Sequence, residues 1–81
     1  MKPELRPIRY THHARQRIIE RHISEAEVEQ VIRTGARQPD GVKKWIAFGT
    51  INGRRLEVVY VETEEGEIEV LLVLSLYERR Y

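Results

Sequence analysis

The 81-residue sequence contains no cysteine and only one residue each of tryptophan, phenylalanine and methionine. Without cysteine the chain can form neither a disulfide framework nor a thiolate metal site, which is typical of a reducing compartment. Residues 1–10 lack the apolar segment of a signal peptide, and no apolar run approaches the roughly 20 residues of a membrane span. We therefore expect a soluble, cytoplasmic protein with no membrane segment.

Several catalytic and cofactor motifs are also missing. The sequence has no P-loop, no dinucleotide-binding fingerprint, and no serine or cysteine nucleophile constellation. Its three histidines do not suit zinc, because the adjacent His12 and His13 project about 100° apart on a helix and no helical H-x-x-x-H pair exists. We therefore expect no cofactor and no metal.

The composition predicts a globular chain, with 41% hydrophobic and 33% charged residues. We expect one domain over residues 1–81, in which residues 1–7 form a loose lead-in because of Pro3 and Pro7. The net charge of +1 gives no overall field that attracts nucleic acid. However, residues 1–22 carry six Lys/Arg against two Glu and all three histidines, whereas residues 62–69 carry five Glu and no base. This asymmetry predicts one basic and one acidic region.

The N-terminal half contains two helix signals. Thr11 is a suitable N-cap for a helix over residues 12–21. Ser24 and Glu27 form a capping box for a second helix, and Ile23 can pack on Val28 as a hydrophobic staple. Gly35 is placed to end this helix as a left-handed C′ residue.

The C-terminal half follows a strand pattern. A loop over residues 36–42 is followed by expected strands at 44–51, 54–62 and 67–77, joined by an Asn52-Gly53 hairpin turn and a second turn at residues 64–66. The last strand is apolar on both faces, which predicts the interior of the sheet. Residues 8–10 can form a further short strand. The expected fold class is α+β, with two N-terminal helices packed on one face of a small antiparallel sheet in the order β-α-α-β-β-β. The helices should bury Ile18, Val28, Val31 and Ile32 against Ile46, Phe48, Leu56 and Val58.

The first helix carries a row of basic side chains. His13, Arg17 and Arg21 are spaced four residues apart, so each step advances about 40° around the helix and about 6 Å along it. Two interpretations remain open. The arginines can pair with carboxylates elsewhere in the fold, or they can offer planar guanidinium groups to phosphate oxygens.

His13 is the candidate general base. It falls in the first helical turn, where the helix dipole and the nearby Arg17 favour a neutral imidazole that can accept a proton near pH 7. The alternative is a structural histidine that is hydrogen-bonded to the backbone or packed on a strand.

Other basic and aromatic residues form weaker candidates. We expect the hairpin to bring Lys44 together with Arg54 and Arg55 in one basic end that phosphate can use, although such charges also serve solvation and edge protection. In the C-terminal tail, Tyr77 can donate a proton or stack on a base, and Arg79 can contact phosphate. Tyr77 can equally be a core or dimer contact.

At these residues the sequence resembles a known family. The motif Thr11-x-His13-Ala14-x-x-Arg17-x-x-x-Arg21-x-Ile23-Ser24, followed by Gly53-Arg54-Arg55-Leu56-x-Val58-Val59-Tyr60, is similar to the bacterial domain of unknown function numbered 4258. That family is grouped with the RelE/ParE-like toxin superfamily, in which two N-terminal helices pack on a small antiparallel sheet. The last strand departs from the family pattern, because VLLVLSL stands where the family has a threonine-containing end.

The resemblance implies a small bacterial toxin-like protein. RelE-like members are metal-independent ribonucleases that often act on ribosome-bound mRNA, and ParE-like members inhibit gyrase. Carried over to this chain, it implies a site that contains His13, Arg17 and Arg21, together with Arg55. If the chain is an endoribonuclease, we expect the catalytic residues to be His13, Arg17, Arg21 and Tyr77, and the substrate-binding residues to be Arg55, Arg54, Lys44 and Arg79. The expected partners are an antitoxin protein, RNA or the ribosome, and a second copy of the chain. A non-catalytic RNA- or protein-binding module that uses the same basic face is the alternative.

Overall fold

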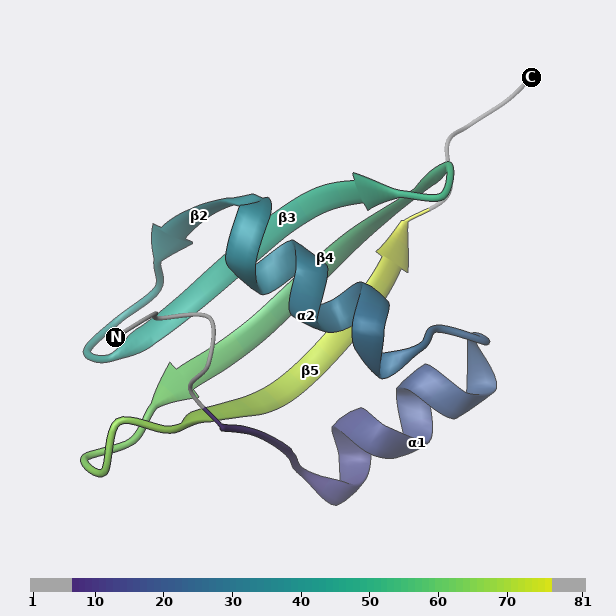
Figure 1. Cartoon of the computed structure of the whole chain (residues 1–81). Coiled ribbons are helices and arrows are strands. Elements are labelled where there is room, and N and C mark those ends of the chain that lie inside the picture. Colours follow the sequence, from purple (N-terminus) through teal and green to yellow (C-terminus); the bar gives the residue numbers. More distant parts are fainter. Residues whose placement is uncertain (1–6, 77–81) are drawn as a thin grey trace.

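The computed structural model describes residues 7–76, which form two helices and a five-stranded sheet (Figure 1). In chain order the elements are β1 (Ile8–Tyr10), α1 (His12–Glu20), α2 (Glu25–Thr34), β2 (Ala36–Pro39), β3 (Lys44–Ile51), β4 (Arg54–Glu62) and β5 (Ile68–Leu76). The α+β class, both helices and the three long strands confirm the sequence prediction.

The sheet is mixed and not wholly antiparallel. Its strand order is β1-β5-β4-β3-β2, in which β1 pairs parallel with β5 and every other neighbouring pair is antiparallel. The expected antiparallel sheet is therefore wrong in one strand pair. Between β1 and β5 the chain passes through both helices and through β2, β3 and β4. Parallel neighbours need such a long connection, and here it brings β5 beside β1 in the same direction. The interior position of β5 is as expected.

Residues 36–39 form the edge strand β2, where the sequence predicted a loop. All four of its residues are exposed, so no apolar alternation marks them as a strand. They form a strand because β3 presents an unpaired row of backbone groups on that side. Pro39, which lacks a backbone N–H, is tolerated because β2 is the outer strand.

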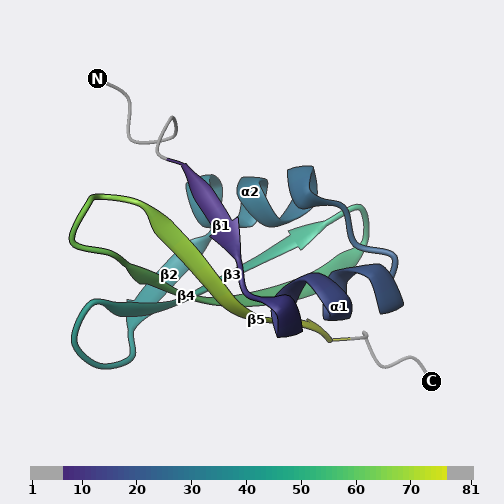
Figure 2. The ribbon, with the colours of Figure 1, turned by 90° about the horizontal axis from the view of Figure 1, so that it is seen from below.

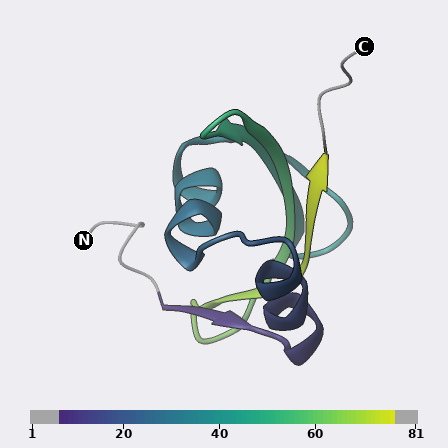
Figure 3. The same ribbon diagram turned by 90° about the vertical axis from the view of Figure 1, so that its right-hand side faces the viewer.

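Both helices pack on the same face of the sheet, which curves around them (Figures 2 and 3). The core comprises buried residues of both helices and of one side of the strands: Ala14, Ile18, Ile23, Val28, Val31, Ala47, Leu56, Val58, Tyr60, Ile68, Val70 and Val73. Ile46 and Phe48 were expected in this core but alternate with Trp45 and Ala47, so they lie on the opposite face. The prediction took the wrong phase of the in–out alternation along β3, and an offset of one residue exchanges the two faces.

Gly35 ends α2 without the expected left-handed conformation. Its φ of −77° and ψ of 167° are extended, because the chain turns directly into β2. Glycine is required here for a different reason: a Cβ at this position would overlap the carbonyl oxygens of Phe48 and Val31. The close approach of α2 to β3 therefore depends on the missing side chain.

The Asn52-Gly53 turn forms as predicted. Both residues have positive φ angles, of 54° and 79°, and Ile51 pairs with Arg54 across the turn. This is the geometry of a two-residue type I′ hairpin, which matches the twist of the flanking strands.

Candidate functional site

The first helix begins at a cap that also fixes it to the sheet. The Thr11 hydroxyl accepts a hydrogen bond from the Ala14 N–H at 3.1 Å and lies 3.3 Å from the Leu71 carbonyl oxygen, to which it donates. Leu71 is the residue that interrupts the β4–β5 register. With Ala14 and Ile18 buried against the sheet, the basic row of α1 lies on the outer part of the helix.

Two residues of that row share a surface hollow. His13 and Arg17 line a depression of about 240 Å³ together with Gln16 and Glu20. His13 is exposed and Arg17 is half-buried. The Gln16 amide donates to the Glu20 carboxylate at 3.5 Å. The hollow thus combines an imidazole and a guanidinium with one carboxylate. The guanidinium can bind an anionic group, and the imidazole or the carboxylate can accept a hydrogen bond from a hydroxyl of the same ligand.

Gln16 and Glu20 were not among the site residues predicted from the sequence. The signal for them was present, because positions 13, 16, 17 and 20 follow the three- and four-residue spacing of one helix face. Neither residue is basic, so neither belongs to the predicted basic row.

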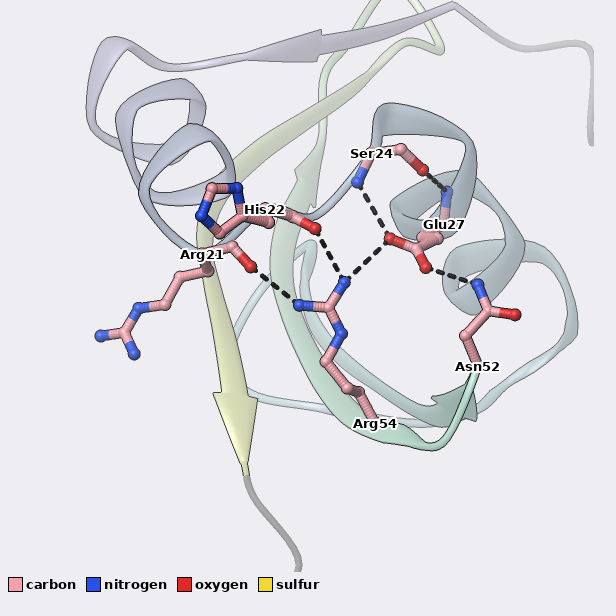
Figure 4. Close-up of polar contacts among 6 residues, drawn as sticks. All are labelled: Arg21, His22, Ser24, Glu27, Asn52 and Arg54. Atoms are coloured by element: carbon pink, nitrogen blue, oxygen red, sulfur yellow. Dashed lines mark hydrogen bonds and ion pairs between the residues drawn. The ribbon is translucent and has the colours of Figure 1, made fainter.

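Arg21 continues the row but does not line the hollow. Its side chain is exposed and extends away from the corner between the helices, while its carbonyl faces the sheet (Figure 4). Within residues 7–76, neither Arg17 nor Arg21 forms an ion pair. No ion pair within the described residues therefore occupies these two guanidinium groups, and Glu20 is the carboxylate that shares the hollow with Arg17.

The corner after α1 is a Schellman-type ending. The Ile23 N–H bonds to the Ile18 carbonyl at 2.8 Å, and the His22 N–H bonds to the Ile19 carbonyl at 3.2 Å. His22 takes the left-handed position with a φ of 57°, where glycine is usual. Ile18 and Ile23 are both buried, which supplies the hydrophobic contact of this motif. The corner therefore turns α2 back over the sheet.

Arg54 holds this corner against the β3–β4 hairpin (Figure 4). Its guanidinium donates to the Arg21 and His22 carbonyl oxygens, each at 2.8 Å, and pairs with the Glu27 carboxylate at 3.2 Å. The sequence predicts Arg54 to be a substrate-binding residue. In the structure its guanidinium instead satisfies the carbonyl groups of the two residues that follow α1, Arg21 at the C-cap and His22.

Glu27 collects three hydrogen-bonding groups. Its carboxylate accepts from the Ser24 N–H at 3.0 Å and from the Asn52 amide at 2.6 Å, in addition to Arg54. The Ser24 and Asn52 hydrogen bonds, followed by the Arg54 charge, hold the pKa of Glu27 below its usual value of 4.5. The predicted capping box is present and also anchors the hairpin turn.

The expected basic end of the hairpin does not form. Lys44 pairs with Val61, whereas Arg54 pairs with Ile51, so Lys44 and Arg54 lie at opposite ends of the two strands. The error arises because Lys44 opens β3 while Arg54 opens β4, and antiparallel strands run in opposite directions. Lys44 lies 3.6 Å from Asp40, and Arg55 is exposed. The other two candidates, Tyr77 and Arg79, lie outside the described residues.

A second cluster joins the two helices on the other side of α1. Arg15 pairs with Glu25 at 2.7 Å and stacks over the Tyr10 ring, with its guanidinium carbon 5.2 Å from the ring centre. Burial, reinforced by the carboxylates of Glu25 and Glu29, raises the pKa of the Tyr10 phenol far above its usual range. These contacts explain why Arg15 belongs to the helix interface and not to the hollow.

Two kinds of feature are absent from residues 7–76, namely a metal-binding cluster and a membrane-spanning helix. Among residues 7–76, no group of three or more His, Asp or Glu side chains could hold a metal ion. In the same range, neither helix has the length and apolar character needed to cross a membrane.

The protein is thus a small α+β domain with a mixed five-stranded sheet, and the basic flank of α1 is exposed on its surface. Residues 10–77 match the family model described as "Domain of unknown function (DUF4258)", and the chain belongs to this family. No curated protein and no solved structure matches the chain.

Proposed function

We propose that this protein is a RelE-like, metal-independent ribonuclease that binds the RNA backbone along the outer flank of α1. The observation that supports this proposal is the shared hollow of His13 and Arg17, which lies on a flank with no ion-paired arginine among residues 7–76. Guanidinium groups that lack a carboxylate partner are available to phosphate oxygens. The resemblance to RelE-like toxins supplies the reaction class.

The proposed reaction is transfer of the RNA phosphodiester to the neighbouring ribose hydroxyl. His13 accepts the proton of the 2′-OH, whose oxygen attacks the adjacent phosphorus while the bond to the 5′ oxygen breaks. Arg17 and Arg21 stabilise the charge of the phosphorane oxygens. Tyr77, a candidate from the sequence, or a water molecule donates a proton to the leaving 5′ oxygen. The products are a 2′,3′-cyclic phosphate and a 5′ hydroxyl.

The test measures cleavage of end-labelled single-stranded RNA in the presence of EDTA, as free RNA and as ribosome-bound mRNA. We expect His13→Ala and Arg17→Ala each to slow cleavage by about 100-fold or more, as for loss of a general base or a charge-stabilising donor. His12→Ala and Arg33→Ala are matched controls, since both residues are exposed helical residues of the same type outside the hollow. Equal cleavage by wild type and His13→Ala would exclude His13 from the mechanism.

A binding module without turnover is the second candidate. Within residues 7–76 the His13 imidazole has no hydrogen-bond partner that would orient it as a base, in contrast to the usual arrangement of a catalytic histidine. For this function we expect RNA binding that weakens steeply with salt, and no cleavage. In Arg17→Ala, the slope of log binding constant against log salt concentration should fall by about the value of one phosphate contact. An adjacent antitoxin gene product that blocks RNA binding would support either function.

A further inference from the structure

The face of the sheet opposite the helices is largely apolar. Ile46, Val59 and Leu72 form one row across β3, β4 and β5, because Ile46 pairs with Val59 and Val59 pairs with Leu72. Phe48 and Leu74 stand in the next row, on either side of Glu57. These apolar side chains are only partly buried, since among residues 7–76 neither helix contributes to this face (Figure 3).

Charges of both signs border this apolar centre. Arg55 lies on the same face at the end near the Asn52-Gly53 turn and is exposed. Glu69 lies at the other end, where it pairs with Val61. Lys44 stands beside Val61 but already faces Asp40, at 3.6 Å. Within residues 7–76, Arg55 and Glu69 form no ion pair, so each is available to a partner.

We propose that this open face binds a second copy of the chain in a two-fold symmetric dimer. A two-fold axis that lies between the sheets and runs perpendicular to β4 reverses the strand direction of the second copy. The two apolar rows then cover each other, and Arg55 of each copy stands over the end that carries Glu69 of the other. The face is thus complementary to itself both in apolar character and in charge.

The charge balance of the face favours this occupant over nucleic acid. Two cations, Lys44 and Arg55, and two anions, Glu57 and Glu69, lie on it, so it carries no net field for a polyanion. Nucleic acid instead suits the basic flank of α1. The dimer proposal is therefore independent of the proposed ribonuclease function, and a dimer can form whether or not the protein cleaves RNA.

The size of the face and the position of Glu57 predict weak association. Three strands about 4.8 Å apart and about six residues long give a footprint of about 300 Å² per copy, less than half of a standard interface. Glu57, within the apolar part, must lose water when the face is covered. We expect a dissociation constant of about 10 μM to 1 mM.

The test is sedimentation velocity of the full chain from about 10 μM to 1 mM in low salt. We expect a monomer–dimer equilibrium, with dissociation constants raised about tenfold in Arg55→Glu and in Glu69→Arg by loss of two symmetric ion pairs. The double variant Arg55→Glu/Glu69→Arg should restore the wild-type constant. Glu57→Gln should tighten the dimer by about tenfold. Arg33→Glu, on the exposed side of α2, should leave it unchanged.

A second measurement locates the interface even where a variant folds poorly. In wild-type protein, NMR signals of Phe48, Val59 and Leu72 should shift as the concentration rises, while those of His13 and Arg17 stay constant. Wild type that remains monomeric at 1 mM would overturn the proposal, and a different protein would then be the occupant of this face. Shifts confined to α1, or a double variant as weak as the single variants, would overturn it as well.

Discussion

At the scale of single residues, the conformation of this fold depends on a few positions where one side chain is excluded or required. Gly35 is the clearest case, because its neighbours are the backbone carbonyl oxygens of Phe48 and Val31, which cannot move without breaking the contact between α2 and β3. The glycine was recognisable in the sequence as a helix end. Its role in close packing was not, since that role depends on a strand that follows later in the chain.

Substitution of Gly35 tests this role. We expect Gly35→Ala to lower the free energy of unfolding by about 3 kcal/mol, because the added Cβ overlaps main-chain atoms. Gly49→Ala is the matched control, since a Cβ there meets the Val31 side chain at an ordinary contact distance of 3.6 Å. Urea unfolding of both variants gives the comparison. A Gly35→Ala variant as stable as Gly49→Ala would contradict the packing argument.

At the scale of elements, the polar network of Glu27 joins three pieces of the chain. The carboxylate caps α2 through Ser24, holds the hairpin through Asn52, and meets the Arg54 guanidinium that satisfies the end of α1. The capping box could be predicted from Ser24 and Glu27, which are three residues apart. The Asn52 and Arg54 contacts could not, because they join residues 25 and 27 positions apart, which only the packing of α2 on the hairpin brings together.

The lowered pKa of Glu27 makes this network sensitive to acid. Because the folded state favours the charged carboxylate, its contribution is complete above the unfolded pKa of about 4.5 and is lost as the pH falls through the lower folded pKa. We expect Glu27→Gln to be less stable than wild type by about 1–2 kcal/mol at pH 7, with the difference shrinking below pH 4.5. Urea unfolding across pH 3–7 measures it.

Glu64→Gln serves as the control for this experiment. Glu64 is exposed in the β4–β5 turn, so its variant should match wild type at pH 7. A stability difference between Glu27→Gln and wild type that stays constant from pH 7 to pH 3 would show that the carboxylate charge does not carry the effect.

At the scale of the whole molecule, the two faces of the sheet have different roles. One face contacts both helices and contains the core, and the other is open among the described residues. The molecule is also polarised, with the basic flank on α1 and five glutamates in residues 62–69. The proposed RNA site and the proposed dimer face therefore lie on separate surfaces.

The neighbouring residues Val58 and Val59 test this sidedness. Val58 is fully buried, whereas Val59 lies on the open face. At micromolar concentration we expect Val58→Ala to lower the free energy of unfolding by about 2 kcal/mol and Val59→Ala by less than about 1 kcal/mol. Thermal or urea unfolding measures both. Equal losses would mean that the two faces are equally buried in the protein.

The sequence by itself determined the α+β class, both helix starts, the Asn52-Gly53 turn and the placement of β5 inside the sheet. It could do so because caps, turns and apolar periodicity act within a few residues of one another. Only the tertiary structure decided the parallel β1–β5 pair, the strand β2, which face Ile46 and Phe48 occupy, and the separation of Lys44 from Arg54. These features depend on pairing between distant segments, where a shift of one residue moves a side chain to the other face of the sheet.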